Sequence, residues 1–581
     1  MKELNNRLFI SGESIQELYN WYSKKTLIVN RLYQRKLVWT LNEKQKLIDT
    51  ISRDYPIPLF LLAEMSDGKN EIIDGMQRFS SIFHFIENDF SFNGKFFDLE
   101  TLATTNTLKK EGILVQKEPI LDREICTKIA NYKLAISIYK KDNNEIINDI
   151  FSRINSYGKK LSRQEIRQVG TTEEFPELVK SIAVKIRGDV SHSNILELNK
   201  MKNISIDMED GTNNTIRASE IFWCKQNILT KNDIRDSEDE ALIANILVSI
   251  LTNIKYRISN NDLDYFYGKP TSNNDTDIKK ANERKKELSN SFNSHGKEKI
   301  ESDFFVIFDL IKSLDININS KRNFIALFIA LHNLYFNKNK EIKEKDNFIA
   351  KIYLAISKLE TTQGGVWAKE NIQQSVSLIE DLVTHAMKDS PKVAVNTEKI
   401  TEIENILAIS QIESIHYDIK QGLHNLDTIS KFNNNLFIRL METICAISNN
   451  GKNEKGYIII GVADKHDDKI KIEKQYNAEN SSRQCNDYFI TGLNGEISNY
   501  DSFDSYYKKV SDLFEVEKKK FKNLGKCLLE PINYYDRNLL VFRIESSNEI
   551  CSYDNKVYLR VGSQTKEAEA MQIIEIVERF K

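Results

Sequence analysis

The chain has 581 residues, of which 40% are hydrophobic and 29% charged, and its mean hydropathy is -0.45. These values describe a soluble globular protein, exclude disorder over most of the chain, and predict about three or four domains. Lysine and arginine number 82 against 84 aspartates and glutamates, and the resulting formal charge of -2 excludes a global attraction to nucleic acid or membranes.

The six cysteines are scattered, without a CxxC pair or histidines at metal-binding spacing, which predicts free buried thiols in a reducing compartment. The start of the chain lacks the apolar core of a signal peptide, and the longest apolar run, at 241–251, is too short to span a bilayer. We therefore expect a cytoplasmic protein.

The hydrophobic pattern changes along the chain and predicts an α+β multidomain protein. Short strand-like runs alternate with amphipathic helical stretches over residues 1–170, and apolar residues at helical spacing dominate 171–388. A break with Pro391 predicts a linker at 389–402, and strand-like runs return in a second α/β module at 403–581. Because GxxxxGK[ST] is absent, a P-loop motor is not supported.

The stretch EIIDGMQRFSSIFHFI at 71–86 places polar residues between a strand and a helix. Gly75 permits the turn, and Arg78 in the first helical turn adds a cation near free backbone N–H groups, an arrangement that suits a phosphate. Asp74 could hold that arginine, orient a water or bind a metal. Equally, Asp74 could be a helix cap paired with Arg78 at the surface, and the residues alone favour neither reading.

Two further segments accompany this turn: NRLYQRKLVWT at 30–40 and FSRINSYGKKLSRQEIR at 151–167. Taken alone, the first segment predicts an edge strand with an aromatic anchor. The second predicts a helix that ends at Gly158. In their order with DGMQR, however, they closely resemble the GmrSD-type family, the first domain of modification-dependent restriction systems. The resemblance covers about the first 170 residues and implies a fold related to ParB and sulfiredoxin.

The resemblance also implies a site that binds and hydrolyses a nucleoside triphosphate. Met76 departs from the family pattern, which has a second glutamine there, so the resemblance leaves hydrolysis open. The residues that it implies are Asp74, Gly75, Gln77 and Arg78, with Gln34, Arg35, Arg153 and Asn155 as neighbours.

A second group of polar residues lies in IESIHYDIKQG at 412–422. Asp418 and Lys420 are two residues apart in a strand-like run and share one face, and Glu413 precedes them. Acids followed by acid-x-Lys recur in nucleases, where carboxylates hold a divalent ion and the lysine steadies the attacking water or the developing charge. A solvated strand face with an exposed ion pair is the plainer alternative.

The segments METICAISNNGKNEKGYIIIGVADK at 441–465 and VYLRVGSQTKEA at 557–568 resemble the Schlafen AlbA-type domain, and the match runs from about 405 to 575. In nucleolytic members, the resemblance implies a Mg²⁺ or Mn²⁺ site. Many bacterial members are described only as DNA-binding regulators. The implied catalytic residues are Glu413, Asp418, Lys420 and Asp464, and the three acids are the implied metal ligands.

Two places in the C-terminal module suit contact with nucleic acid. Arg560 in the closing segment could contact phosphate or brace the sheet. The stretch at 506–526 interleaves lysines with aromatics. This pattern is equally typical of a surface that binds a nucleic-acid strand and of a solvent-exposed helix face. We take Arg560 with Lys518, Lys519 and Lys520 as the candidate nucleic-acid-binding residues.

Together these patterns predict a bacterial anti-phage defence protein. Its N-terminal domain would bind and hydrolyse a nucleoside triphosphate or sense a phage-derived trigger. The helical middle would carry that state to a metal-dependent nuclease that cleaves RNA or DNA, with assembly into a homo-oligomer left open. The alternative is a non-catalytic regulator that binds nucleic acid and a nucleotide.

Overall fold

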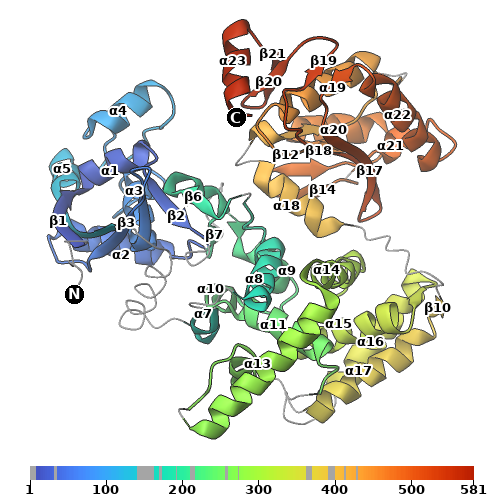
Figure 1. Ribbon diagram of the computed structural model, residues 1–581. Coiled ribbons are helices and arrows are strands. Elements are labelled where there is room, and N and C mark those ends of the chain that lie inside the picture. The colour runs from blue at the N-terminus through green and yellow to red at the C-terminus, as the bar shows by residue number, and fades with distance from the viewer. Residues whose placement is uncertain are drawn as a thin grey trace. The chain divides into compact units, whose positions relative to one another are not determined.

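The computed structural model divides the chain into two compact units, residues 1–301 with 317–388 and residues 302–316 with 389–581 (Figure 1). We describe each unit by itself. The structure describes residues 8–31, 36–140, 162–168, 173–191, 193–209, 216–255, 259–272, 274–360, 369–389, 399–410, 414–426, 430–479 and 481–580.

The first unit begins with a mixed sheet in the order β1-β5-β3-β4-β2-β6. β1 pairs antiparallel with β5, β5 parallel with β3, and β3 antiparallel with β4. β4 is parallel to β2, and β2 pairs antiparallel with β6, so the sheet includes a strand from beyond residue 170. The strands are β1 (Leu8–Ser14), β2 (Leu27–Asn30), β3 (Phe60–Glu64), β4 (Asn70–Asp74), β5 (Lys133–Lys140) and β6 (Ile195–Glu197).

α3 (Met76–Ile86) follows β4 directly, as the pattern at 71–86 predicts. Gly75 begins the helix with a φ of 103°, and an added Cβ would collide with the ring of Phe60, so this turn requires glycine. The ring of Phe60 lies 4.2 Å from that of Phe79, which ties the helix to the sheet. The apolar face of α3 is buried through Phe79, Ile82, Phe83 and Ile86.

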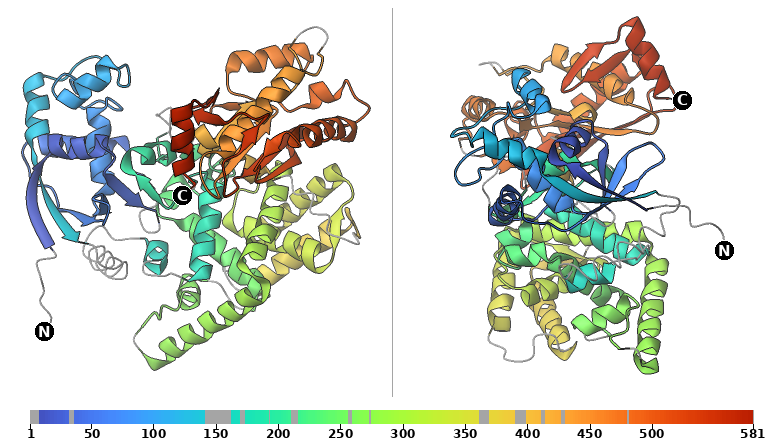
Figure 2. Two further views of the ribbon diagram at one scale, coloured as in Figure 1. Left: turned by 45° about the horizontal axis from the view of Figure 1, so that its top comes forward. Right: turned by 90° about the vertical axis from the view of Figure 1, so that its left-hand side faces the viewer.

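The remaining helices around the sheet are short, and beyond them the unit is mainly helical, as predicted (Figures 1 and 2). β7 (Ile206–Asp207) pairs with β8 (Ile216–Arg217), and β9 (Lys340–Ile342) with β10 (Met387–Asp389). The helices are α1 (Ile15–Ser23), α2 (Leu41–Ser52), α4 (Ala103–Lys110), α5 (Arg123–Asn131), α7 (Arg163–Gln168), α8 (Glu174–Arg187), α9 (Phe222–Lys225), α10 (Lys231–Arg235), α11 (Glu238–Leu251), α12 (Asn260–Phe266), α13 (Asp275–His295), α14 (Lys297–Ser313), α15 (Lys321–His332), α16 (Lys345–Glu360) and α17 (Lys369–Thr384).

A fully buried ionic cluster joins β2 to α8 and α11. The Arg187 guanidinium lies 3.1 Å from Asp189, 2.8 Å from Asp239 and 3.4 Å from Glu240, and all four side chains are 0% exposed. Arg31, next after β2, pairs with the other oxygen of Asp189 at 3.0 Å. Buried charges are tolerated only when they are paired and hydrogen-bonded, so this cluster fixes the geometry of three elements together.

The same cluster region holds the chain on both sides of the LYQR motif. On one side lies Arg31, and on the other the Lys36 ammonium donates to Ser237 Oγ at 3.1 Å and to the carbonyl of Ile234. Burial lowers the pKa of Lys36. Residues 32–35 themselves, with the predicted Gln34 and Arg35, lie outside the described residues.

The second unit is built on a four-stranded sheet in the order β11-β12-β18-β17. β11 runs parallel to β12, and the other pairs are antiparallel. The elements are α18 (Ile400–Ser410), β11 (Tyr417–Lys420), α19 (Asn434–Ser448), β12 (Lys455–Ile460), β13 (Val462–Ala463), α20 (His466–Gln475), β14 (Arg483–Cys485), β15 (Tyr488–Ile490), α21 (Asn494–Ile497), α22 (Phe503–Lys518), β16 (Phe521–Lys522), β17 (Lys526–Tyr534), β18 (Arg537–Glu545), β19 (Ser552–Tyr553), β20 (Tyr558–Val561), β21 (Gln564–Glu567) and α23 (Ala570–Glu578).

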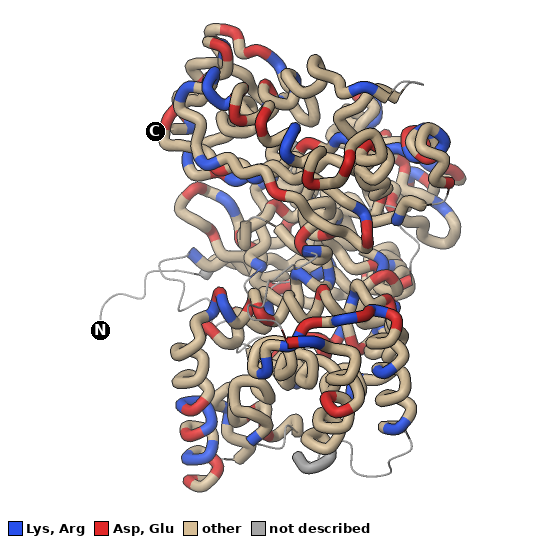
Figure 3. The backbone as a smooth tube through the Cα atoms, turned by 90° about the vertical axis from the view of Figure 1, so that its right-hand side faces the viewer, with Lys and Arg blue, Asp and Glu red and all other residues tan. Residues whose placement is uncertain are grey.

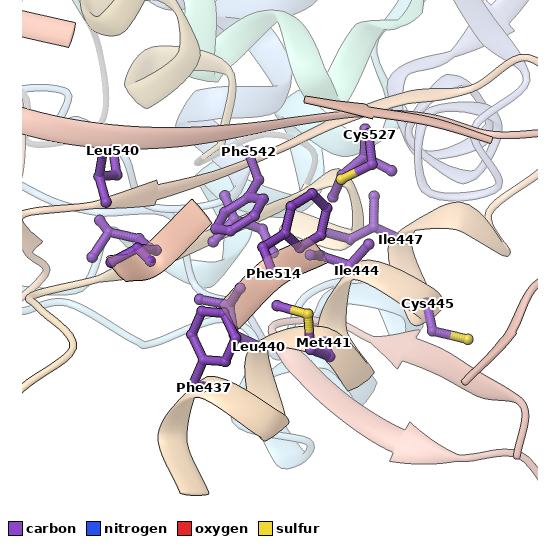
Figure 4. Close-up of a cluster of buried hydrophobic side chains, with 14 of the residues drawn as sticks. Phe437, Leu440, Met441, Ile444, Cys445, Ile447, Phe514, Cys527, Leu540 and Phe542 are labelled. Carbon is purple, nitrogen blue, oxygen red and sulfur yellow. The ribbon is translucent and has the colours of Figure 1, made fainter. Parts of the chain in front are cut away.

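Both faces of this sheet are covered, because successive side chains of a strand point to opposite faces. On β12, Ile458 and Ile460 join the cluster formed by α19 and α22 (Figure 4), whereas Ile459 joins the cluster under α18. A two-sided core explains why the strand sequence GYIII is continuously apolar rather than alternating.

The C-terminal part of α14 belongs to the second unit and contacts α18. Asp309 accepts from the hydroxyl of Thr401 at 2.6 Å, and Lys312 pairs with Glu404 at 2.5 Å. Burial raises the pKa of Asp309 to about 6. The α+β first part, the helical middle and the α/β C-terminal part are thus confirmed, while the domain boundaries stay a prediction. Among the described helices, none is long and apolar enough to cross a membrane.

The buried ionic cluster predicts a large stability effect. Arg187→Met removes the central cation and leaves buried acids uncompensated, so we expect the free energy of unfolding of the first unit to fall by about 3–5 kcal/mol. Urea unfolding followed by circular dichroism measures the loss. Lys185→Met is the matched control, since Lys185 lies on the same helix with a side chain 40% exposed in its pair with Glu301, and its loss should cost less than about 1 kcal/mol. Equal losses in the two variants would contradict the assignment.

A second prediction concerns acid stability. Burial lowers the pKa of His84 on α3 to about 3, so the folded state holds this imidazole neutral. The folded pKa of His84 lies below the unfolded value of about 6.5. The stability that the neutral imidazole contributes to the folded state is therefore complete above pH 6.5 and is lost as the pH falls toward 3. His84→Gln should flatten the decline in melting temperature between pH 6.5 and 4.5, and His295→Gln, at an exposed position, should leave that decline as in wild type.

Candidate functional site

Asp418 and Lys420 lie on β11 and face the same side of the sheet, in register with Ile458 and Ile460 of β12. The Asp418 carboxylate is 9% exposed and the Lys420 ammonium 29% exposed, and Lys420 Nζ lies 2.6 Å from Asp418 Oδ2. The pair is therefore partly buried rather than a solvated strand face. Its lysine is the more accessible partner.

Arg560 reaches the same carboxylate from the β20–β21 hairpin. Its Nη1 lies 3.4 Å from Asp418 Oδ1, and its Nη2 donates to the carbonyl of Tyr417 at 2.8 Å. The guanidinium is only 2% exposed, and burial lowers the pKa of Arg560 while Asp418 raises it. Among the described residues, the Asp418 carboxylate thus faces two cations, Lys420 and Arg560.

Of the three predicted metal ligands, the structure describes Asp418 and Asp464. Glu413 lies outside the described residues, and Asp464 is an exposed residue that follows β13. Within the described ranges, no group of three or more His, Cys, Asp or Glu side chains is placed to hold a metal ion. The three-acid metal site stays a prediction.

The predicted lysines of the nucleic-acid surface lie at the end of α22. Lys518 pairs with Glu515 at 3.6 Å and Lys520 with Glu517 at 2.8 Å, while Lys519 is exposed at the helix end. Basic and acidic residues are interspersed along the chain in the view of Figure 3. Two of the three lysines are therefore partly offset by acids of their own helix.

A buried hydrogen-bond cluster fixes the loop after β11, and sequence reasoning missed it. Glu496 Oε1 accepts from the backbone N–H groups of Leu423 and His424 at 2.8 and 2.9 Å, and Oε2 accepts from the Tyr506 hydroxyl at 2.7 Å. Burial raises the pKa of Glu496. A side chain at position 422 would collide with this carboxylate, so the loop requires glycine there. No local pattern around Glu496 signals its role, because its partners lie 10 to 73 residues away.

In the first unit, Gln77 connects the DGMQR turn to the segment after the LYQR motif. Its Oε1 accepts from the backbone N–H groups of Val38 and Trp39 at 3.1 and 3.3 Å, and its Nε2 donates to the carbonyl of Lys36 at 2.7 Å. Both ends of the amide are therefore used within the chain. The DGMQR turn and the segment at 36–39 are thus joined directly by hydrogen bonds.

Arg78 is likewise held by its own chain. It donates to the carbonyls of Pro58 and Leu59 and pairs with Asp74 at 2.7 Å, and its guanidinium lies 4.3 Å from the centre of the Phe60 ring. The arginine side chain is 11% exposed, whereas the carboxylate of Asp74 is 39% exposed. Of this turn, Asp74 is the charged group most open to a ligand.

A small cleft lies beside Gln77 and has a polar lining. Its volume of about 30 Å³ admits about two waters. A polar stripe of α3 forms one wall. The cleft is lined by Leu37, Trp39, Lys44, Gln77, Ser80, Ser81, His84, Ser205, Ile206 and Asp207. The predicted neighbours Arg153 and Asn155 lie outside the described residues.

Comparison with known proteins finds two families that match two separate regions of the chain. Residues 15–169 match the family described as GmrSD restriction endonuclease, N-terminal domain, and residues 413–569 match the family described as Schlafen, AlbA_2. No curated protein and no solved structure matches the chain. The first match contains Asp74 to Arg78, and the second contains Glu413, Asp418, Lys420 and Arg560. The chain therefore joins a GmrSD-type N-terminal domain to a Schlafen AlbA-type C-terminal domain.

Proposed function

We propose that the protein is a defence nuclease whose C-terminal domain cleaves RNA or DNA and whose N-terminal domain binds a nucleoside triphosphate. The observation that carries the proposal is the partly buried Asp418–Lys420 pair on β11, within the region that matches the Schlafen AlbA family. A partly buried acid beside a lysine supports this reading, because phosphodiester hydrolysis can use both groups. The match to a restriction endonuclease domain supports a role in defence.

The residues present fit a divalent ion in one respect. Asp418 Oδ2 is buried and, within the described residues, lies 2.6 Å from the Lys420 ammonium, so a divalent ion bound to this oxygen would take the place of that lysine. Asp418 would hold Mg²⁺ or Mn²⁺ together with Glu413 and Asp464. When bound, such an ion supplies Lewis-acid stabilisation of the phosphate and activation of a water.

Lys420 has a separate role in this proposal. Its side chain is the more exposed of the pair, at 29% against 9% for Asp418, so it could turn from Asp418 toward a phosphate oxygen. It would orient the scissile phosphate and stabilise the charge that develops on it. The exposed Lys519 and its neighbours at the end of α22 would guide the nucleic-acid backbone toward this site.

For the N-terminal domain, the support is the family match and the exposed Asp74 at the start of α3. Because Gln77 and Arg78 are used within the chain, we assign them to holding the site, and Asp74 to the nucleotide through its metal ion. A phage-derived trigger and the nucleotide would act on the nuclease through this domain.

A non-catalytic regulator is the second candidate. It is favoured by the neutralisation of Asp418 by two cations, because such a carboxylate can serve as a brace for the fold rather than as a metal ligand. In that case nucleic acid would bind to the lysines of the domain and would stay intact.

The nuclease assignment predicts the effect of Asp418→Asn. Labelled tRNA, single-stranded DNA and duplex DNA are incubated with Mn²⁺ or Mg²⁺, with and without nucleoside triphosphates. Wild type should cleave at least one substrate, and Asp418→Asn should lower the rate by about 100-fold or more, since the isosteric amide removes the negative charge. Asp512→Asn, at an exposed position on α22, is the matched control and should retain the wild-type rate. If wild type binds the substrates without cleaving them, the nuclease assignment is wrong and the non-catalytic regulator is favoured.

The nucleotide assignment predicts a metal-dependent defect in Asp74→Asn. Calorimetric titration with ATP and GTP should show affinity reduced by about tenfold in the presence of Mg²⁺, and little change with EDTA, if Asp74 acts through the ion. Asp67→Asn in the exposed β3–β4 turn should bind like wild type. An equal loss with and without the ion would show that Asp74 acts through Arg78 instead.

A further inference from the structure

Arg560 is buried, and this burial bears on the two roles that the sequence leaves open for it, contact with phosphate and bracing of the sheet. Its side chain is 2% exposed, whereas Lys566 on the partner strand of the hairpin is exposed. A guanidinium inside the protein offers no donor to a nucleic-acid phosphate unless the hairpin opens. The position therefore requires a role inside the domain.

The guanidinium of Arg560 contacts both the backbone of β11 and the carboxylate of Asp418. Nη2 donates to the carbonyl of Tyr417 at 2.8 Å, and Nη1 lies 3.4 Å from Asp418 Oδ1. A planar guanidinium with fixed donors thereby couples the peptide before Asp418 to the direction of its carboxylate. The second oxygen of Asp418, Oδ2, lies on the side of Lys420, 2.6 Å from its Nζ.

A second layer fixes the arginine itself. Arg560 and Thr565 are cross-strand partners in the hairpin, and Nη1 donates to Thr565 Oγ1 at 3.0 Å. Thr565 Oγ1 in turn lies 3.0 Å from Thr443 Oγ1 on α19. The chain of contacts runs from the core helix through the hairpin to the acid, and it uses hydroxyl groups whose removal barely changes side-chain volume.

We propose that Arg560 is a positioning residue for Asp418, with Thr565 holding the arginine, and that it makes no contact with nucleic acid. The inference rests on the proposed nuclease function, in which the direction of the Asp418 carboxylate sets the rate. Loss of the Arg560 guanidinium frees the carboxylate without removing a surface charge that the substrate meets. The chemical step should then suffer, while substrate binding should not.

The test compares Arg560→Gln, Thr565→Val and the control Lys566→Gln in the full chain, with the labelled substrate that wild type cleaves. We expect kcat to fall by tenfold or more in Arg560→Gln and by a smaller factor in Thr565→Val, with KM within twofold of wild type. Dissociation constants measured with EDTA, across a series of salt concentrations, should keep the wild-type salt dependence in both. Lys566→Gln should retain kcat.

A weaker dissociation constant with a shallower salt dependence and unchanged kcat in Arg560→Gln would instead identify a phosphate contact and overturn the proposal. Melting temperatures of Arg560→Gln, Asp418→Asn and the double variant give a readout independent of cleavage. Non-additive shifts support the coupling, and additive shifts overturn it. If wild type cleaves nothing, the proposed function fails on that result alone, and the melting temperatures still decide whether Arg560 holds Asp418.

Discussion

The arrangement of the C-terminal domain depends on one short edge strand that carries an acid. In the described part of the chain, β11 has four residues and pairs in the sheet only with β12, so backbone groups on its outer edge face no strand there. Arg560 satisfies one of them, the carbonyl of Tyr417, and Glu496 holds the loop that follows. The strand that bears Asp418 and Lys420 is thus fixed by residues from 72 to 143 positions away.

The topology explains why these distant residues can meet. Parallel pairing of β11 and β12 requires a crossover, which α19 supplies, and the same helix receives the β20–β21 hairpin on its surface. One helix therefore positions both the strand with the acid and the hairpin with the arginine. Thr443 on α19 lies at the point where these contacts join.

The sequence predicts the local parts of both sites. The spacing of Asp418 and Lys420 places them on one face of a strand, and Gly75 followed by an apolar helical stripe places the turn before α3. Contacts between segments far apart are missed, because residue type alone does not reveal them. Glu496 is of a residue type that mostly lies at the surface, yet it is buried with specific partners, and for Arg560 the sequence leaves phosphate contact and bracing of the sheet equally open. The cluster around Arg187 was missed for the same reason.

The two motifs differ in how their charges are held, and this difference separates their chemistry. The Asp74–Arg78 pair is local, four residues apart across the junction of β4 and α3, and the arginine also donates to backbone carbonyls while the acid stays 39% exposed. At Asp418 the order is reversed, with a buried acid, a buried arginine and the lysine facing outward. An outward cation favours an anionic ligand such as a phosphate, whereas an outward carboxylate favours a cation. These electrostatics support the proposal that Lys420 contacts the substrate and that Asp74 binds an ion.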